Sequence, residues 1–299
     1  MILDGLERGA AVVVIRLRSM GDTVLTTPAL ALLKAHRSDL RIHVVLEPAW
    51  TRLLEGNPDV SGVIELKRRA VREIRRLGPA LCLNLHGGVT SAWLAALSGA
   101  RWRAGFGHFR YWLAYNVRIP RAQQILGRAT DAPVHTAEHL ASALFHLGVP
   151  QTEIPRARLY AKPSPPRRPY AVVHTGATHP TKQWPAERFA ALAGWLRESQ
   201  GLEPVVIRGP EDGTLDEMMA RIAGAELFVG NDSGPAHVAA AFGVPTVVIF
   251  GSSNSRTWYP WRVPHQVVET ASGSILSVEA DQVRRAVTAL VGARAALRA

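Results

Sequence analysis

Three polar segments each follow a short apolar run, and each carries residue types that could bind or react with an anionic substrate. The most informative is Val229-Gly230-Asn231-Asp232-Ser233-Gly234-Pro235-Ala236-His237. Here an apolar run ends, polar residues and glycines turn the chain, and Pro235 suits the first turn of a helix. Free backbone N–H groups around Ser233 and Gly234, with the helix dipole, would form an anion site. The alternative is an ordinary helix N-cap by Asp232 or Ser233.

The second segment, residues 174–185, also lies between a predicted strand and a predicted helix. It contains several hydroxyl groups and one lysine, Lys182, beside Thr181. Hydroxyls and a lysine at the carboxyl end of a strand suit a phosphate group. Trp184 and Pro185 would anchor the start of the helix. A solvated loop lysine is the alternative.

The third segment, residues 16–23, follows the first predicted strand and contains Asp22. A carboxylate at this position could deprotonate a hydroxyl as a general base. The alternative is that Asp22 caps the next helix. The loop has a single glycine, Gly21, so it is not the three-glycine fingerprint of dinucleotide-binding proteins.

Metal chemistry is disfavoured by the sequence. Asp-x-Asp does not occur, and no cluster of His, Cys and carboxylate residues has the spacing of metal ligands. The eleven histidines are scattered along the chain.

The elements that must position these segments alternate regularly between strand and helix. In the first half, strands are predicted at 12–15, 42–46, 63–64, 80–85 and 104–106, with helices at 26–35, 50–54, 91–97 and 136–147. Pro28 would then lie in the first turn of its helix, where a missing N–H costs nothing. Continuous apolar strands alternating with helices are typical of a parallel sheet that is covered on both faces.

The same alternation restarts after a proline-rich segment, residues 162–169, which predicts a semi-rigid linker. Strands are predicted at 170–173, 205–208, 227–229 and 246–250, with helices at 185–198, 215–222, 235–242 and 278–290. The sequence therefore predicts two α/β domains, residues 1–162 and 163–299. Ligands of such sheets bind at the carboxyl ends of the strands.

Composition narrows the range of partners and locations. The chain has 299 residues, 47% of them hydrophobic and 20% charged, and a net charge of +11. The positive charge would attract nucleotides, nucleic acid or an acidic membrane surface. The alternative is that it follows from an arginine-rich composition and has no binding function. There is no clustered nucleic-acid-binding signature. With one cysteine, Cys82, no apolar run of membrane-spanning length and no signal-peptide pattern, we expect a cytoplasmic protein.

Together these segments resemble glycosyltransferase family 9, the ADP-heptose:lipopolysaccharide heptosyltransferases. The resemblance runs in order along nearly the whole chain, through 19–22, 26–30, 55–58, 85–88, 181–185 and 230–237. It implies a GT-B architecture, in which two Rossmann-like domains face each other across a cleft. Residues 1–162 would bind the acceptor and residues 163–299 the nucleotide sugar.

The resemblance also implies an inverting transfer of heptose from ADP-heptose to a lipopolysaccharide inner-core acceptor, with no cofactor and no required metal. By motif position, Asp22 matches the general base and Lys182, beside Thr181, a contact to the donor phosphates. The other donor-binding matches are Asp232, Ser233, Gly234, His237 and, less closely, Glu211. Without a metal, a lysine and helix N-terminal amides must stabilise the leaving diphosphate.

One segment departs from the family. Between Arg208 and the Asp232 motif the family usually has a further helix and strand, whereas here 209–212 leads almost directly into 213–217. Glu211 and the nucleotide-base site fall in this shortened part.

Other functions also fit part of this sequence pattern. A related transferase with another nucleotide sugar, or a nucleotide-sugar epimerase of the same two-domain shape, would keep the nucleotide site. A basic protein that binds nucleic acid or a membrane surface would be indifferent to nucleotide sugars. The acceptor is expected to be an anionic glycolipid and not a nucleic acid. The arginines of residues 68–76 would then face acidic lipid at the inner face of the inner membrane, or would be merely solvated.

Overall fold

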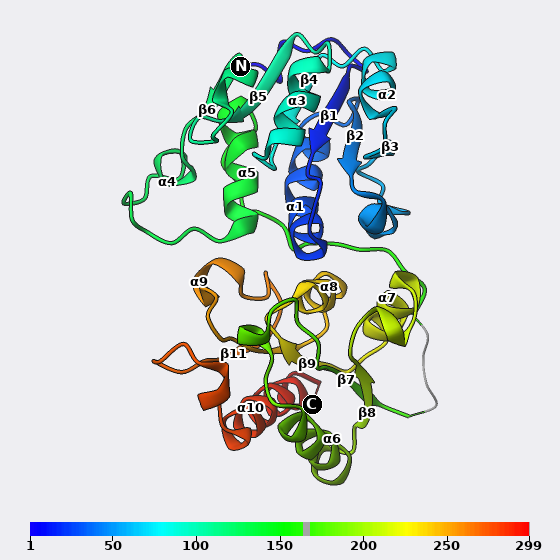
Figure 1. Cartoon of the computed structure of the whole chain (residues 1–299), viewed down its shortest axis with the longest axis vertical. Helices are drawn as coiled ribbons and strands as arrows, with labels where there is room; N and C mark the ends of the chain where they lie inside the picture. Colours follow the sequence, from blue (N-terminus) through cyan, green and yellow to red (C-terminus); the bar gives the residue numbers. More distant parts are fainter. Residues whose placement is uncertain (164–167, 299) are drawn as a thin grey trace. The chain divides into compact units, whose positions relative to one another are not determined.

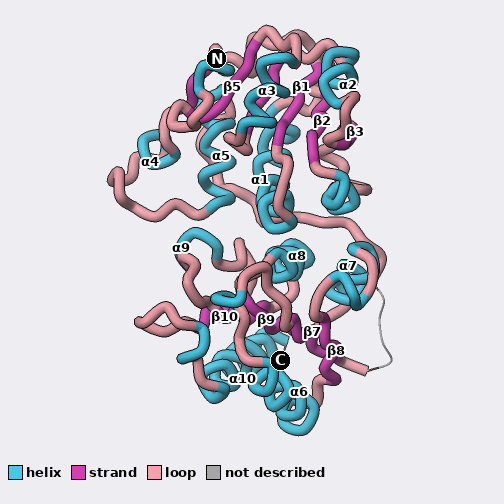
Figure 2. Tube along the Cα trace, viewed as in Figure 1, coloured by secondary structure: helices cyan, strands magenta, loops and turns pink. Residues whose placement is uncertain are grey.

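The computed structural model describes residues 1–163 and 168–298, and the chain forms two compact units, Met1–Arg158 and Leu159–Ala299. Each unit contains one parallel sheet with helices between its strands (Figures 1 and 2). The predicted proline-rich linker follows the boundary between the units, and its residues 164–167 lie outside the described residues. The predicted α/β class is confirmed for both units.

The N-terminal unit has a six-stranded sheet with the strand order β3-β2-β1-β4-β5-β6. The strands are β1 (Ala11–Ile15), β2 (Arg41–Leu46), β3 (Gly62–Glu65), β4 (Leu81–Asn84), β5 (Trp102–Phe106) and β6 (Val117–Ile119). The α-helices are α1 (Met20–His36), α2 (Ala70–Arg76), α3 (Val89–Leu97), α4 (Ala122–Ile125) and α5 (Thr136–Leu147), and short 3₁₀ turns are η1 (Pro48–Leu54) and η2 (Trp112–Ala114). Every residue of β1 is buried, as expected for an apolar strand covered on both faces.

Helix α1 begins six residues earlier than the sequence pattern predicts, so the placement of Pro28 in a first turn is wrong. Pro28 lies inside the helix and cannot supply an N–H to the carbonyl of Val24. The hydroxyl of Thr27 donates to that carbonyl instead, at 2.8 Å. The helix therefore continues through the proline, because a side chain replaces the missing backbone donor.

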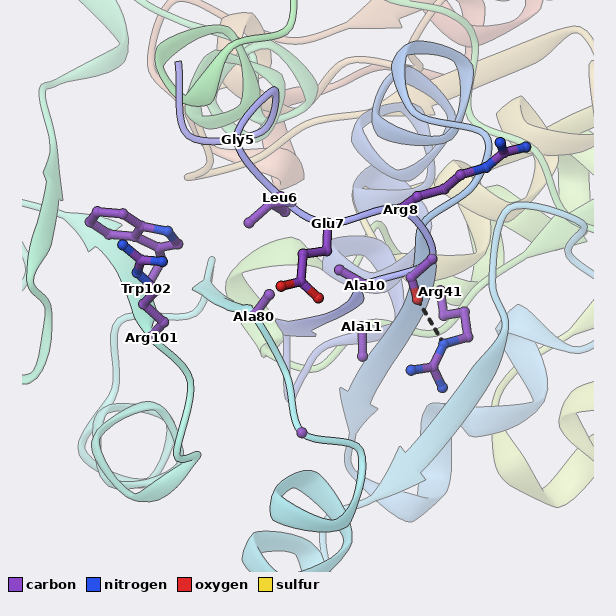
Figure 3. Close-up of a pocket in the computed structure, with 12 residues that line it drawn as sticks. Gly5, Leu6, Glu7, Arg8, Ala10, Ala11, Arg41, Ala80, Arg101 and Trp102 are labelled. Carbon is purple, nitrogen blue, oxygen red and sulfur yellow. Dashed lines mark hydrogen bonds between the residues drawn. The ribbon is translucent and has the colours of Figure 1, made fainter.

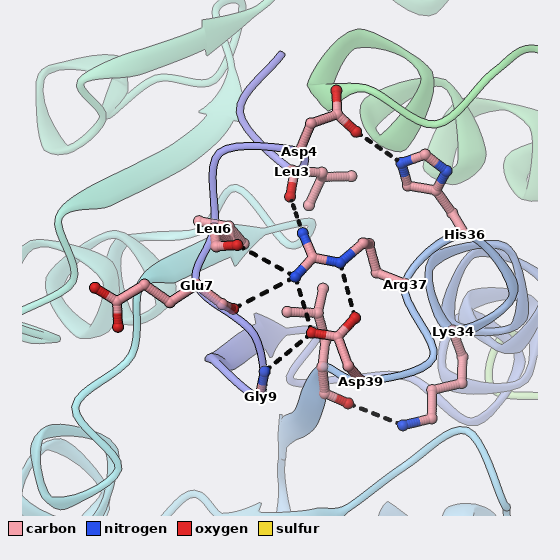
Figure 4. Close-up of polar contacts among 10 residues, drawn as sticks. Leu3, Asp4, Leu6, Glu7, Gly9, Lys34, His36, Arg37 and Asp39 are labelled. Atoms are coloured by element: carbon pink, nitrogen blue, oxygen red, sulfur yellow. Dashed lines mark hydrogen bonds and ion pairs between the residues drawn. The ribbon is translucent and has the colours of Figure 1, made fainter.

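An arginine at the end of α1 bonds to several of the first nine residues (Figure 4). The guanidinium of Arg37 donates to the carbonyls of Leu3 and Leu6 at 2.5 and 3.2 Å, and to both carboxylate oxygens of Asp39 at 2.8 Å. Asp39 also accepts from the backbone N–H of Gly9 at 2.9 Å. These hydrogen bonds place the pKa of Asp39 well below its usual range, with Arg37 as the main cause.

The C-terminal unit has a five-stranded sheet with the order β11-β10-β9-β7-β8. Its strands are β7 (Tyr170–His174), β8 (Glu203–Ile207), β9 (Leu227–Asn231), β10 (Thr246–Ile249) and β11 (His265–Val268). Its α-helices are α6 (Ala186–Gln200), α7 (Leu215–Ala223), α8 (Gly234–Phe242), α9 (Ser255–Trp258) and α10 (Ala280–Arg298), with 3₁₀ turns η3 (Pro180–Lys182), η4 (Pro210–Asp212) and η5 (Ile275–Ser277).

The two sheets have the same connectivity except at one edge. Strands β8, β7, β9, β10 and β11 correspond in order to β2, β1, β4, β5 and β6, and β3 has no counterpart among residues 168–298. Between β8 and β9 the chain forms only η4 and α7. The shortened segment found in the sequence therefore corresponds to a missing outer strand, and it leaves β8 at the sheet edge with Val206 45% exposed.

Within the described residues, no helix combines the length and apolarity that a bilayer crossing requires.

Candidate active site

The candidate donor site lies at the carboxyl edge of the C-terminal sheet, where β7 and β9 are neighbours. From β7 the strand order runs one way to β8 and the other way to β9, β10 and β11. Such a switch point leaves the loops after the two central strands free to bind a ligand. The two predicted donor-binding segments, 174–185 and 230–237, contain the loops that follow β7 and β9.

Lys182 and Asp232 come together at this edge although they are 50 residues apart in the chain. The Lys182 ammonium donates to a carboxylate oxygen of Asp232 at 2.8 Å. Asp232 is buried, whereas the side chain of Lys182 keeps 30% of its surface exposed. The ammonium is thus fixed in direction and still open to a ligand on one side.

Helix α8 begins beside this ion pair with an end that no side chain caps. Ser233 is its N-cap residue, and Gly234 and Pro235 are its first helical residues. The predicted alternative, a side-chain cap by Asp232 or Ser233, is not formed. Uncapped N–H groups at a helix N-terminus attract an anion such as a phosphate.

The hydroxyl of Ser233 is instead held by a buried histidine. Ser233 Oγ and His174 Nδ1 are 3.2 Å apart and share a hydrogen bond, and the same hydroxyl donates to the Asn231 carbonyl at 3.1 Å. Burial lowers the pKa of His174 to about 4. His174 is therefore a neutral positioning residue at the end of β7.

Asn231 joins the two loops and was missed in the sequence as a site residue. Its side chain is fully buried, and its amide oxygen accepts from the backbone N–H of Trp184 at 3.1 Å. Its amide nitrogen donates to the carbonyls of Thr175 and Gly176 at 2.9 and 3.3 Å. The loop after β7 is thereby bonded to the last residue of β9 at three points.

Trp184 anchors the far end of the same loop in the core. The indole is 2% exposed, donates from Nε1 to the carbonyl of Val278 at 2.8 Å, and meets Phe189 edge to face. Lys182 lies two residues before this anchor, so its backbone has little freedom to move.

A third loop, after β10, contacts Thr181 and was also missed. Ser252 Oγ donates to Thr181 Oγ1 at 3.3 Å. A Cβ on Gly251 would lie 2.4 Å from the carbonyl oxygen of Thr181, so only glycine permits this approach. Gly251 directly follows an apolar run in the sequence, and this position was the signal that could have identified the loop as part of the site.

The remaining predicted donor-binding residues, Glu211 and His237, lie on η4 and α8. Glu211 is exposed in η4, after β8, at the same edge of the sheet. His237 is 4% exposed on α8, with its ring 6.0 Å from the ring of Trp258.

In the N-terminal unit, Asp22 lies at the corresponding edge, after β1. One of its carboxylate oxygens forms an ion pair with Arg16, whose guanidinium also donates to the Leu85 carbonyl. The other oxygen accepts from the backbone N–H and the hydroxyl of Ser19, at 3.0 and 3.2 Å. Asp22 is therefore the third helical residue of α1 and forms a capping box with Ser19, which was the alternative drawn from sequence.

The loop after β4 lies next to this carboxylate. Asn84 is fully buried, accepts from the backbone N–H groups of His86 and Gly87, and donates to the Tyr115 hydroxyl at 2.7 Å. Burial, and then the positive charges of Arg16 and Arg18, lower the pKa of His86. Asn84 thus has the same place in its sheet as Asn231, at the end of the strand next to the first one, but it holds its own loop and not that of the neighbouring strand.

A separate cavity of about 350 Å³ lies at the opposite edge of the N-terminal sheet (Figure 3). Ala11, Arg41 and Trp102, which begin β1, β2 and β5, are among its lining residues, and Arg41 donates to the Gly9 carbonyl at 3.0 Å. The cavity contains none of the predicted site residues. In parallel α/β sheets the reactive edge is the carboxyl one, so this cavity is not the candidate active site.

Across residues 1–163 and 168–298, no group of three or more His, Cys, Asp or Glu side chains is arranged to hold a metal ion. The groups that could hold a diphosphate are therefore one ammonium, the N-terminus of α8 and the surrounding hydroxyls. This set can neutralise a phosphate and stabilise it as a leaving group.

Comparisons with known proteins agree with this chemistry. The model of "Glycosyltransferase family 9 (heptosyltransferase)" matches residues 68–213 and 212–284. Lipopolysaccharide heptosyltransferase 3 of Escherichia coli is 23% identical over 305 aligned residues, covering 82% of this chain and 84% of the relative.

Two solved structures share the fold over nearly the whole chain. The glycosyl transferase family 9 protein of Veillonella parvula DSM 2008 has a TM-score of 0.82 at 23% identity, covering 97% of this chain and 98% of its own. ADP-heptose lps heptosyltransferase II of E. coli has a TM-score of 0.80 at 20% identity, covering 95% and 99%. The predicted GT-B fold is confirmed by these likenesses. Since the family model spans most of both units, this chain belongs to glycosyltransferase family 9, the heptosyltransferase family.

Proposed function

We propose that this glycosyltransferase transfers a heptose from ADP-heptose to a saccharide of the lipopolysaccharide inner core, with inversion and without a required metal. The observation that carries the proposal is the convergence of Lys182, Asp232 and the uncapped N-terminus of α8 at one sheet edge. This arrangement suits a diphosphate whose negative charge grows as the bond to the sugar breaks. The similar E. coli protein is named for ADP-heptose and for lipopolysaccharide, which supports this donor and acceptor.

In this proposal, residues 159–299 bind the donor. Lys182 neutralises the diphosphate, and the backbone N–H groups of Ser233 and Gly234 hydrogen-bond to it. Thr181 lies beside the phosphates, Asp232 directs the ammonium, and His237 and Glu211 contribute to the donor pocket. His174 keeps the Ser233 hydroxyl in place.

Residues 1–158 bind the acceptor, and Asp22 takes the proton from its attacking hydroxyl. Each carboxylate oxygen has two lone pairs, so the three bonds from Arg16 and Ser19 leave acceptor capacity for a fourth donor. Inversion requires that the hydroxyl attacks the sugar on the side opposite to the departing diphosphate. The glycolipid acceptor implies a peripheral enzyme at the cytoplasmic face of the inner membrane.

The donor is tested by calorimetry with ADP, GDP and UDP, followed by transfer assays with the matching sugars in the presence and absence of EDTA. We expect ADP to bind most tightly, and heptose transfer to a water-soluble acceptor to survive EDTA. Preference for UDP or GDP would indicate a related transferase with another donor. Conversion of the sugar without any acceptor would indicate an epimerase, and loss of transfer with EDTA would contradict metal independence.

The function of Lys182 is tested by Lys182→Ala. Removal of a charge-assisted hydrogen bond to phosphate, worth about 1.5–3 kcal/mol, should weaken ADP binding roughly tenfold to a hundredfold and also slow transfer. Lys162→Ala removes an exposed lysine of the same unit and should change neither quantity. Unchanged ADP affinity in Lys182→Ala would contradict the proposed diphosphate site.

A further inference from the structure

The N-terminal unit contains a long stretch without acidic residues. Between Glu73 and Asp131 the sequence has no aspartate or glutamate and has eight arginines. The stretch includes α3 and η2, and it begins in α2, which carries Arg72, Arg75 and Arg76. Much of the chain's positive charge is thus placed in one part of one unit.

Helix α3 presents an apolar stripe to solvent within this stretch. Val89, Trp93 and Leu97 follow one another at intervals of four residues, which places them on one face of the helix. They are 48%, 62% and 46% exposed, respectively. Single exposed apolar side chains are common in proteins, but an aligned row that includes a tryptophan marks a contact surface.

Two neighbouring elements extend the stripe. Helix α3 packs against both α2 and η2. In η2, Leu113 is 79% exposed, and Trp112 lies under the guanidinium of Arg118, 3.9 Å from its ring centroid. On the α2 side, exposed arginines line the adjoining surface, and the side chain of Arg75 lies beside Gly99, just after α3.

We infer that this surface, formed by Arg72, Arg76, Val89, Trp93, Leu97 and Leu113, docks on a bilayer that contains acidic lipid. Aliphatic and indole side chains enter the interfacial region of a membrane, while adjacent arginines meet the phosphates of its headgroups. The inference does not depend on the proposed donor or acceptor, because it concerns where the enzyme binds and not what it transfers.

Two other occupants fit the surface less well. In a symmetric dimer built on this face, each arginine cluster would meet the same patch of the second copy, without acidic residues to balance it. A nucleic acid would use arginines and stacked aromatic rings, but Val89, Leu97 and Leu113 offer it nothing to bind.

The test is co-sedimentation of the full-length protein with vesicles of phosphatidylcholine, with and without phosphatidylglycerol. Binding should require the acidic lipid and should weaken as salt is raised. Trp93→Ser should weaken it roughly tenfold. Arg72→Glu should weaken it about 25-fold, because each charge near the surface contributes about fivefold and the reversal changes two.

Matched control variants come from the C-terminal unit. Leu276 is as exposed as Trp93, at 62%, and Arg285 is an exposed arginine of α10, so Leu276→Ser and Arg285→Glu should bind vesicles like the wild type. Transfer to a water-soluble acceptor should be unchanged in all four variants. If the wild type did not transfer heptose to that acceptor, the result would count against the proposed function and not against membrane docking.

Three results would overturn the inference. They are equal binding to neutral and acidic vesicles, a Trp93→Ser variant that binds like the wild type, and a dimer in ultracentrifugation that Trp93→Ser dissociates. Tight binding to RNA that Arg72→Glu abolishes, without binding to vesicles, would assign the surface to nucleic acid.

Discussion

At the scale of single residues, the polar groups of the candidate site divide into those proposed to contact a ligand and those that hold the first group in position. In the C-terminal unit, Lys182 remains partly open, whereas Asp232, His174 and Asn231 are buried and bonded to the loops around it. In the N-terminal unit, the carboxylate of Asp22 is both the proposed base and part of a helix cap. It is the only predicted site residue there, and it also takes part in the capping box of α1.

The two functions of Asp22 can be separated by substitution. Asp22→Asn should leave ADP affinity nearly unchanged and reduce turnover by roughly 10²–10⁴, the usual contribution of a general base. It should also cost about 1 kcal/mol of stability, as the loss of a cap does. Ser19→Ala removes a capping partner but keeps the carboxylate, so it should lose stability with nearly normal turnover. Equal turnover in Asp22→Asn and Ser19→Ala would mean that Asp22 is only a helix cap.

His174 should make folding sensitive to mild acid. Its pKa is lowered to about 4 in the folded protein by burial, against 6.5 ordinarily, so below pH 6.5 only the unfolded state takes up the proton. His174 should therefore lower the free energy of unfolding by about 1.4 kcal/mol for each pH unit of acidification between pH 6.5 and 4. Urea unfolding at pH 7.5 and pH 5 measures this effect. Between these two pH values, the unfolding free energy of His174→Gln should fall by about 2 kcal/mol less than that of the wild type.

The control for this measurement is His179→Gln, since His179 is exposed in the same loop and should leave the pH dependence unchanged. His174→Gln should also weaken ADP binding, because the Ser233 hydroxyl loses its partner. A pH dependence identical to that of the wild type would show that His174 is not buried as a neutral group.

At the scale of elements, the site depends on how closely the loops after β7, β8, β9 and β10 can approach one another. A Cβ on Gly176 would lie 1.8 Å from the carbonyl oxygen of Arg208, and one on Gly230 would lie 2.8 Å from the carbonyl oxygen of His174. Glycine is therefore required at these strand ends for contact between backbones. The missing outer strand beside β8 leaves these contacts in place, because they involve only β8 and the strands on its other side.

Gly176→Ala should force the loop after β7 away from the end of β8. We expect a loss of about 1–3 kcal/mol in unfolding free energy and a weaker affinity for ADP. Gly194→Ala is the matched change within α6, where a Cβ would meet nothing within 4 Å, and it should stabilise the protein by up to about 1 kcal/mol. Calorimetry of both variants with ADP checks this, and normal ADP binding by Gly176→Ala would contradict the close fit of the loop.

At the scale of the whole molecule, each unit has its own sheet and its own core. Trp184, Phe189 and Leu192 belong to the core of the C-terminal unit, and Ile15, Ile74 and Tyr115 to a core cluster of the N-terminal unit. The residues proposed to bind the donor all lie in the C-terminal unit, and the proposed base lies in the other. The two substrates are therefore assigned to separately folded parts of the chain.

This assignment predicts where ADP should slow amide hydrogen exchange. Protection should be strongest in the loops after β7 and β9 and in the first turn of α8, because a bound nucleotide stabilises the states that bind it. Lys182→Ala should lose most of this protection at the same ADP concentration. Strongest protection within residues 1–158 would show that the donor binds to the wrong unit for the proposed mechanism.

The sequence by itself determined the fold class, most of the strands and the loops that contain the candidate site. Apolar runs such as 12–15 and 227–229 can only be covered strands, and a polar loop that follows such a strand must lie at the carboxyl edge of the sheet. Motif order along the chain then pointed to the family. The short edge strands β6 and β11 were not predicted, because a few residues at a sheet edge carry too weak a pattern.

Only the tertiary structure decided which partners the polar residues take. The partners of Asn231 come from residues 175, 176 and 184, and those of Asn84 from residues as far away as Tyr115, so no local pattern reveals them. The same holds for the pairing of Lys182 with Asp232. A buried amide or carboxylate must be satisfied by whatever the fold brings next to it, and that depends on strand order and not on spacing in the sequence.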